Sequence, residues 1–285
     1  MRVATRGSAL ARAQAELAIA ALRSSGVGEL TEVVVATTGD RYPEVPLDRL
    51  EGQGWFAAEL ERALLDGRAE IAVHSAKDLP TSVASGLVVA AHLKRADPRD
   101  AAVTRDGRPL AELAQGARVG TSSLRRQALV HELAPHVQTV PVRGNVDTRL
   151  RKLDAGDVDA LVVACAGLDR LGLGGRAERL DPEVFVPAPA QGVIALEAVS
   201  GSPSAIRCAA IEDPEAAATT AAERAVLAGL GGGCLLPLGA WARVDHGRLR
   251  LVAALAGEDG VRRVEVSGHP AAPAELGARA VEQLR

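Results

Sequence analysis

The sequence predicts an α/β protein with two similar doubly wound domains and a small α+β domain at the C-terminal end. Three observations support this fold class. Strand and helix signals alternate through the first 95 residues, and the alternation restarts after residue 99. From about Glu212 an Ala-rich helix is followed by short alternating segments separated by turns. Strands that alternate with helices favour a mostly parallel sheet with helices on both faces.

The first domain opens with a strand at 2–5 and a helix at 8–23 that Ser8 can cap. Its other elements follow in chain order. They are a strand at 33–38, an amphipathic helix at 55–65 with Phe56, Leu60 and Leu64 facing inward, and strands at 71–74 and 87–92.

The second domain repeats this order, with strands at 117–120, 137–142 and 160–164, helices at 122–133 and 146–153, and a helical turn around Leu168. A short echo links the two domains. R-V-A-T at 2–5 leads into S-A-L-A-R, and R-V-G-T at 118–121 leads into S-S-L-R-R. Chance can produce so short a match, but two similar domains would explain it.

The third domain reads as a helix at 215–230, strands at 240–244, 248–255 and 261–266, and a closing helix at 274–284. The turns between these strands predict a three-stranded antiparallel sheet.

Pro-bearing segments at 96–100 and 187–192 are expected to be crossings between domains. Domain 1 would then comprise 1–95 plus 189–211, domain 2 would comprise 99–186, and domain 3 would comprise 212–285. Ligands in this architecture bind in a cleft at the carboxyl ends of the strands.

Composition excludes several classes. The net charge of −3 argues against a general nucleic-acid binder. Cys165, Cys208 and Cys234 form no C-x-x-C pair or disulfide framework, and the six histidines show no zinc-ligand spacing. The N-terminus has no apolar leader, and no stretch is long enough to span a membrane. We therefore expect a soluble cytoplasmic protein without a metal.

Two segments concentrate arginine beside small residues: G-T-S-S-L-R-R-Q at 120–127 and R-G-N-V-D-T-R-L at 143–150. A guanidinium presents a planar fork that matches a carboxylate or a phosphate. A helix N-terminus adds free N–H groups and a favourable dipole. Together they predict a pocket for an anion with several acidic groups, and an ordinary solvated basic face is the alternative.

H-S-A-K-D-L-P at 74–80 directly follows a buried strand, which places Lys77 and Asp78 where α/β sites lie. A carboxylate there can exchange protons and stabilise a cation, although capping a loop is the commoner role of a lone Asp. His74 and Ser75 suggest a hydrolase triad, but the sequence has no G-x-S-x-G elbow, and His74 is expected to be structural.

Cys234 follows three consecutive glycines, and Pro237 comes shortly after it. Glycines permit a close backbone approach, so this loop can project a thiol into a cleft. Cys165 lies in an apolar strand and is expected in the core. From the residues alone, a reactive Cys234 and an inert one remain equally open.

Taken together, these motifs resemble the porphobilinogen deaminase family, also called hydroxymethylbilane synthases. The resemblance covers essentially the whole chain and is carried, in order, by A-T-R-G-S-A-L at 4–10, H-S-A-K-D-L-P at 74–80, G-T-S-S-L-R-R-Q at 120–127, R-G-N-V-D-T-R-L at 143–150, A-G-L-D-R-L at 166–171 and G-G-C at 232–234.

The resemblance implies a transferase of tetrapyrrole (heme) biosynthesis, and nothing in the sequence demands more than a monomer. It would join four porphobilinogen molecules head to tail into hydroxymethylbilane, with loss of ammonia. It also implies a covalent dipyrromethane cofactor held by a thioether to Cys234, with Asp78 as the catalytic acid/base. The acetate and propionate arms would be bound by arginines with four helping residues: Arg6, Arg125, Arg126, Arg143, Arg149 and Arg170, with Ser8, Lys77, Thr121 and Ser123.

The rival reading is a non-catalytic carboxylate-binding protein, because two α/β domains joined by paired crossings also describe periplasmic-type binding proteins. Such a protein would need neither Cys234 nor Asp78. It would normally carry an export signal, which the first residues do not resemble.

Overall fold

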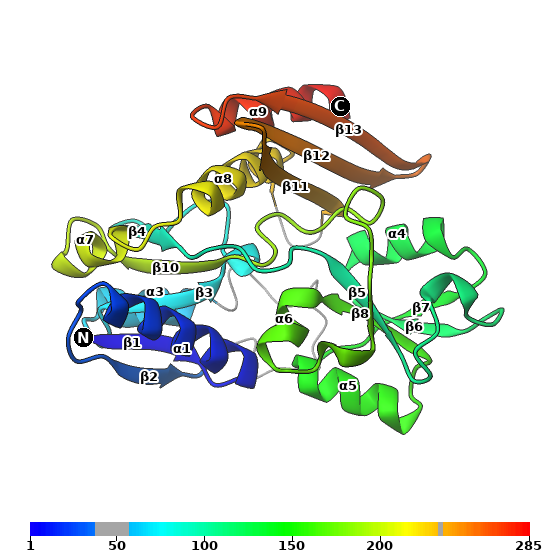
Figure 1. The fold of residues 1–285 in the computed structure, drawn as a ribbon, viewed down its shortest axis with the longest axis horizontal. Coiled ribbons are helices and arrows are strands. Elements are labelled where there is room, and N and C mark those ends of the chain that lie inside the picture. Colours follow the sequence, from blue (N-terminus) through cyan, green and yellow to red (C-terminus); the bar gives the residue numbers. More distant parts are fainter. Residues whose placement is uncertain (38–56, 233–235) are drawn as a thin grey trace. The chain divides into compact units, whose positions relative to one another are not determined.

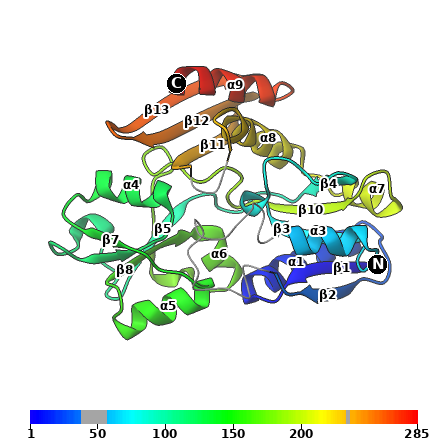
Figure 2. The ribbon, with the colours of Figure 1, turned by 180° about the vertical axis from the view of Figure 1, so that it is seen from behind.

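The computed structural model describes residues 1–37, 57–232 and 236–285. The chain divides into two compact units. Unit 1 comprises Met1–Ala96 and Val193–Ala218, and unit 2 comprises Asp97–Gly192 and Thr219–Arg285. Figures 1 and 2 show the ribbon from opposite sides. The predicted division into three domains remains a prediction.

The described part of unit 1 is built on five strands: β1 (Arg2–Arg6), β2 (Thr31–Val35), β3 (Ile71–Ser75), β4 (Leu87–His92) and β10 (Ile194–Val199). Its helices are α1 (Ala9–Ser24), α3 (Ala58–Leu65), α7 (Pro203–Ala209) and the 3₁₀ turn η2 (Ala76–Asp78). The sheet order is β2-β1-β3-β10-β4. β1, β2 and β3 are parallel, whereas β10 runs antiparallel to both of its neighbours.

Both faces of this sheet are covered. On β3, Ile71 and Val73 pack with residues of α1 in one apolar cluster, whereas Ala72 packs with residues of α3 in another. Because successive side chains of a strand point to opposite faces, a strand buried on both sides is apolar throughout. The predicted doubly wound arrangement is therefore confirmed for this unit.

The first sheet of unit 2 has five described strands: β5 (Asp100–Thr104), β6 (Arg118–Gly120), β7 (Gln138–Val140), β8 (Ala160–Ala164) and β9 (Ala177–Arg179). Its helices are α4 (Leu124–Leu133), α5 (Val146–Ala155) and α6 (Cys165–Arg170), with 3₁₀ turns η3 (Leu110–Glu112) and η4 (Gly174–Arg176). On β8, Leu161 packs on the α5 side and Val162 on the α4 side, so these helices cover opposite faces (Figure 1).

The two sheets share one topology. The order β7-β6-β8-β5-β9 repeats that of the first sheet, with three parallel strands followed by an antiparallel one, β5. The expected pair of similar domains is thus confirmed. Each sheet is mixed rather than mostly parallel, because β5 and β10, which follow the Pro-bearing crossings, both run against their neighbours.

The C-terminal elements are α8 (Pro214–Gly229), β11 (Leu238–Asp245), β12 (Arg248–Gly257), β13 (Gly260–Gly268) and α9 (Pro273–Leu284). The strands form the predicted antiparallel sheet in the order β11-β12-β13. α9 lies over β12 and β13, and Ala222 and Val226 of α8 join the same core (Figure 2). Gly277 lets the two helices approach closely, because a Cβ there would lie 2.5 Å from the Cβ of Ala225.

Several local predictions can be compared with the structure. Ser8 caps α1 by accepting a hydrogen bond from the Ala11 amide at 3.2 Å, as predicted. The helix expected from residue 122 begins at Leu124, with Ser123 as its N-cap. Cys165 was expected in a strand, which was wrong: it begins α6, although it is buried as expected. Residues 55 and 56 of the predicted helix lie outside the described residues.

The first crossing is held within unit 2 by an ion-pair cluster. The Asp97 carboxylate accepts hydrogen bonds from Arg99, at 2.7 Å to Nη2, and from Arg179, which also pairs with Asp169 at 2.7 Å. Burial alone would raise the pKa of Asp97, but these hydrogen bonds outweigh it and lower that pKa from its ordinary 3.8 to about 2.

This cluster gives a pH-dependent contribution to stability. Because the pKa of Asp97 is depressed in the folded state, its contribution is complete above pH 3.8 and is lost as the pH falls through about 2. We expect Asp97→Asn to lower the free energy of unfolding by about 1 kcal/mol at pH 7, after allowance for solvent screening. Urea unfolding at pH 7, 5 and 2.5 measures the difference in free energy of unfolding between the variant and the unmutated protein. A difference that does not become smaller at pH 2.5 would contradict this account.

Candidate active site

The predicted site residues fall into two groups, one in each unit. Unit 1 holds Arg6, Ser8, Lys77 and Asp78. Unit 2 holds Thr121, Ser123, Arg125, Arg126, Arg143, Arg149 and Arg170. Cys234 lies outside the described residues. Each group is described by itself below.

Asp78 sits on the turn that follows a buried strand. β3 ends at Ser75, and the chain passes directly into η2, which carries Lys77 and Asp78. Ser75 exchanges hydrogen bonds with the buried Gln14 of α1, at 2.8 and 3.1 Å, and the Ala76 amide donates to the Val193 carbonyl at 3.0 Å. The start of the turn is thereby fixed while the Asp78 side chain stays exposed.

Asp78 and Arg6 line one pocket together with Gln14, His74 and Ser75. Arg6 is the last residue of β1, and β1 pairs in parallel with β3. The carboxyl ends of neighbouring parallel strands meet at one edge of a sheet, which is where α/β proteins bind ligands. Unit 1 therefore presents an exposed carboxylate and a guanidinium at one hollow.

His74 is paired inside the unit. Its Nε2 lies 3.1 Å from Oε2 of Glu197 on β10, and the two side chains are only 5% and 1% exposed. This burial and pairing agree with the structural role expected for His74.

In unit 2 the predicted residues follow three neighbouring parallel strands. Thr121 comes directly after β6, Arg143 lies shortly after β7, and Arg170 ends α6, which follows β8. β7, β6 and β8 are adjacent in the sheet. These side chains therefore come from one edge of the second sheet, the counterpart of the edge that carries Arg6 and Asp78 in the first.

The G-T-S-S segment shapes the start of α4. Gly120 has no room for a side chain, because a Cβ there would lie 2.7 Å from Cγ2 of Val142. The hydroxyl of the buried Thr121 accepts a hydrogen bond from the Ser123 amide at 3.2 Å. The Ser123 hydroxyl in turn accepts from the Arg126 amide at 3.4 Å. Both hydroxyl residues thus fix the first turn of the arginine-bearing helix.

Arg125 and Arg126 do not form a solvated basic face. Their relative exposures are 4% and 7%, and both pair with the buried Asp100, at 2.7 and 2.6 Å. Burial lowers the pKa of Arg125, and the charge of Asp100 opposes that shift. The alternative of an exposed charged surface is excluded for these two residues.

Arg143, Arg149 and Arg170 have different surroundings. Nη1 of Arg143 is buried and has no hydrogen-bond partner within the described ranges. Arg149 donates from Nε to the Gly144 carbonyl at 2.7 Å, and Arg170 donates from Nη2 to the Gly192 carbonyl at 2.7 Å. Burial lowers the pKa of Arg170. A buried donor without an acceptor is costly, so Arg143 is the residue most suited to receive an anion.

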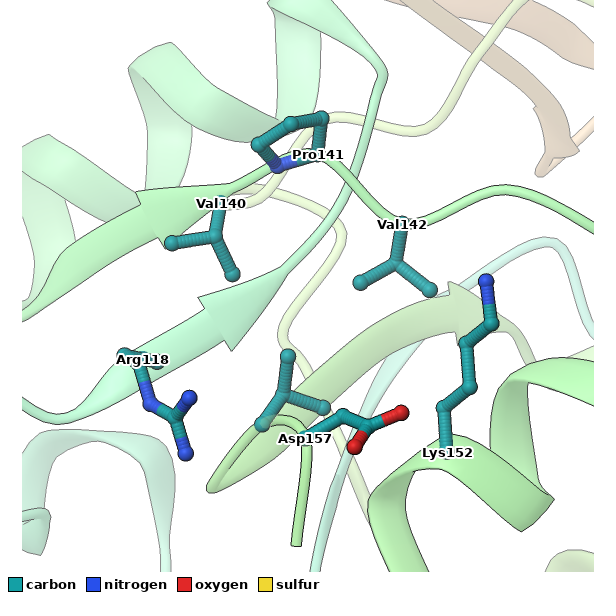
Figure 3. Close-up of a pocket in the computed structure, with 7 residues that line it drawn as sticks. Arg118, Val140, Pro141, Val142, Lys152 and Asp157 are labelled. Atoms are coloured by element: carbon teal, nitrogen blue, oxygen red, sulfur yellow. The ribbon is translucent and has the colours of Figure 1, made fainter. Parts of the chain in front are cut away.

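A second pocket of about 290 Å³ lies elsewhere on unit 2 and is lined by Arg118, Val140, Pro141, Val142, Lys152, Asp157 and Val158 (Figure 3). Arg118 already donates to the Gly156 carbonyl at 2.8 Å and lies beside Asp159. None of the predicted site residues lines this pocket, so the candidate site is not located there.

Among the described residues, Cys165 and Cys208 are buried, and burial is the main cause that raises the pKa of each thiol to about 12. Neither forms a thiolate readily at neutral pH. In the part of the chain that the structure describes, no group of three or more His, Cys, Asp or Glu side chains could hold a metal ion. The helices within the same described ranges are all too short or too polar to span a membrane.

Sequence reasoning missed Asp100 and Gln14. Asp100 lies in a segment interpreted as a crossing, and Gln14 is one polar residue on the inner face of α1. The available signal was weak: an acid was needed to balance the two arginines of 120–127, but the sequence offers 36 acidic residues. The pairing of β5 with β8 in the folded sheet is what places Asp100 beside the two arginines.

Comparison with known proteins adds a consistent result. Residues 1–207 match the family model described as "Porphobilinogen deaminase, dipyromethane cofactor binding domain", and residues 217–285 match "Porphobilinogen deaminase, C-terminal domain". The chain is 44% identical over 290 residues to the porphobilinogen deaminase of Roseiflexus castenholzii, covering 100% of this chain and 95% of that protein. It is 45% identical over 292 residues to that of Acidothermus cellulolyticus, covering 100% and 88%.

Among solved structures, immunogenic lipoprotein A from Vibrio vulnificus matches with a TM-score of 0.45 and 15% identity, covering 76% of this chain and 96% of that one. The periplasmic aliphatic sulphonate binding protein SsuA from Escherichia coli matches with a TM-score of 0.40 and 14% identity, covering 70% and 61%.

Proposed function

Because the chain belongs to the porphobilinogen deaminase family, we propose that the two groups of residues described above serve that family's reaction, with Asp78 as acid/base and Cys234 as the point of cofactor attachment. The chain is a transferase that joins four porphobilinogen molecules into hydroxymethylbilane with release of ammonia, using a dipyrromethane cofactor. The relatives support this reading and not that of a carboxylate-binding protein.

The unpartnered Nη1 atom of Arg143 carries the proposal for the binding site. Each pyrrole ring of the substrate bears two carboxylates, so the cofactor and the growing chain are polyanions. Burying such a group is prohibitive unless cations and hydrogen-bond donors meet it. The residues of unit 2 fit this need. Arg143, Arg149 and Arg170 would hold the carboxylates, with Arg125, Arg126, Thr121 and Ser123 at the same edge of the sheet.

The bound dipyrromethane supplies the pyrrole carbon from which the product chain grows. Asp78 would give a proton to the leaving amine and stabilise the cation left on the substrate when ammonia departs. It would then remove the ring proton once the new carbon–carbon bond has formed. Its exposed position on the turn η2 that follows β3, in a pocket shared with Arg6, supports these roles. Arg6, Lys77 and the Ser8-capped start of α1 would bind substrate carboxylates.

Cys234 is the proposed attachment point. A thioether forms from a thiolate, and burial suppresses the thiolates of Cys165 and Cys208. Of the three cysteines in the sequence, this leaves Cys234.

The proposal also includes a monomer that acts in the cytoplasm and has no nucleic-acid partner. Every residue assigned a role comes from one chain, so no second copy is needed. The net charge of −3 also disfavours general binding to nucleic acid.

Replacing Arg143 tests the binding role. We expect Arg143→Leu to raise KM for porphobilinogen or lower cofactor loading about 10- to 100-fold, because a hydrogen bond to a charged group contributes about 1.5–3 kcal/mol. Steady-state kinetics and intact-protein mass measure the two effects.

Arg118→Leu is the matched control, because this arginine also lies in unit 2 but is already partnered and lines the other pocket. It is expected to behave like the unmutated protein. Equal behaviour of the two variants would remove Arg143 from the binding site.

A further inference from the structure

Three polar side chains in the interior of unit 2 have no part in the proposed function. Asp100 on β5, Gln191 in the second crossing and Glu223 on α8 each have 0% exposure. Buried charged and amide groups are costly unless their hydrogen bonds are satisfied, so their placement calls for a reason.

Asp100 is shared between the two arginines of α4. Its Oδ1 accepts hydrogen bonds from Nε and Nη2 of Arg126, at 2.9 and 2.6 Å, and its Oδ2 accepts from Nη1 of Arg125 at 2.7 Å. Backbone carbonyls complete the arrangement. Arg125 Nη1 also donates to Val186, at 2.8 Å, and Arg126 Nη1 donates to Val162, at 3.0 Å. Each guanidinium is therefore fixed at two or more points.

Gln191 connects this carboxylate to both crossings. Its Nε2 lies 3.2 Å from Asp100 Oδ1 and donates to the Pro98 carbonyl at 2.8 Å. The preceding Ala190 has a φ of +61°, a conformation that L-residues rarely adopt. The Ala190 amide donates to Glu223 Oε2 at 2.6 Å, and Glu223 Oε1 accepts from the Ala242 amide at 2.6 Å. Glu223 thus holds the strained residue in place and, with it, Gln191.

The pairing leaves donors for a ligand. One carboxylate faces two guanidinium groups, so the cluster keeps a net positive charge. Within the described residues, the hydrogen bonds of Arg125 come from Nη1 alone, which leaves the N–H groups of Nε and Nη2. An arginine held in one orientation loses less entropy when it binds a carboxylate than a free one does.

We propose that Asp100 is a positioning residue, which fixes Arg125 and Arg126 so that their remaining N–H groups receive the carboxylates of the bound pyrrole chain. Gln191 supports Asp100 from the second crossing. The inference rests on the proposed function, and Asp100 itself does not touch the substrate.

The test replaces Asp100 by Asn. An amide presents one oxygen and one NH₂ group, so whichever way it turns, an N–H donor faces a guanidinium donor. The matched control is Asp97→Asn, which removes a carboxylate that also bridges two arginines, Arg99 and Arg179, in the same crossing segment. Both variants and the unmutated protein are compared by thermal unfolding, by intact-protein mass, and by kcat and KM for porphobilinogen.

We expect Asp100→Asn to raise KM about 10- to 100-fold with kcat little changed, because the arginines bind the carboxylates before and during the reaction alike. Its mass spectrum should show incomplete cofactor loading. Asp97→Asn should lose stability but keep its loading and its KM. If the two variants match in loading and KM, Asp100 is only structural and the inference is overturned. If the unmutated protein itself carries no cofactor mass, the proposed function fails instead.

Asp100→Asn leaves a buried guanidinium without its counter-charge and could yield no folded protein. Gln191→Met is then measured in its place, because it removes the hydrogen bond to Asp100 and leaves both ion pairs intact. A raised KM with unaltered kcat supports the positioning role, and a KM equal to that of the unmutated protein contradicts it.

Discussion

Asp78→Asn is expected to lower kcat by about 10²- to 10⁴-fold while the cofactor stays attached. Asparagine has nearly the same shape as aspartate, but it neither exchanges protons at neutral pH nor offsets a positive charge. Because the Asp78 side chain is exposed on the turn η2 that follows β3, the substitution should leave the fold and its stability nearly unchanged. Steady-state turnover, thermal unfolding and intact mass separate these effects.

Asp66→Asn is the matched control for this variant. Asp66 is also an exposed acid of unit 1, but it follows α3 and pairs with Arg68 away from the Arg6 pocket. We expect its kcat to equal that of the unmutated protein. A kcat for Asp78→Asn within about threefold of that value would exclude a proton-transfer role for this residue.

Cys234→Ala is expected to abolish turnover, because it removes the proposed attachment point of the cofactor and with it the anchor of the growing chain. Cys208→Ala is its control. Cys208 is fully buried in the core of unit 1, so its truncation should cost about 1 kcal/mol of stability without affecting cofactor content. Product formation from porphobilinogen and intact-protein mass are measured for both variants. Full activity in Cys234→Ala would show that the attachment point is elsewhere.

The elements predicted well from the sequence are those whose signals are local. Ser8 directly before an apolar helical pattern gives the start of α1, and the apolar run before H-S-A-K-D places Asp78 at the end of a buried strand. These predictions need only neighbours along the chain, since capping and strand burial depend on a few consecutive residues.

β5 and β10 were not predicted, and the reason is non-local. β5 directly follows a Pro-bearing segment, and β10 has Glu197 in the middle of an otherwise apolar run. A buried carboxylate argues against a central strand unless a partner is known. That partner is His74, which is 123 residues away in the sequence.

The roles of the arginines also depend on residues that are distant in the sequence. The sequence predicts a cluster of guanidinium groups. It cannot distinguish an arginine that pairs with an internal carboxylate from an arginine whose donors are available to a ligand. Arg125 and Arg126 meet Asp100, which lies 25 and 26 residues earlier, whereas Arg143 keeps a buried donor without a partner. Which arginines bind substrate directly therefore depends on packing that only the folded chain reveals.

The attachment of the cofactor is tested most directly by mass spectrometry of a tryptic digest of the unmutated protein. Cleavage after Arg224 and Arg243 releases the peptide 225–243, which contains Cys234 and no other cysteine. The account predicts that this peptide carries the added mass of one dipyrromethane. An active preparation in which this peptide is unmodified, or in which the added mass lies on the peptides of Cys165 or Cys208, would contradict it.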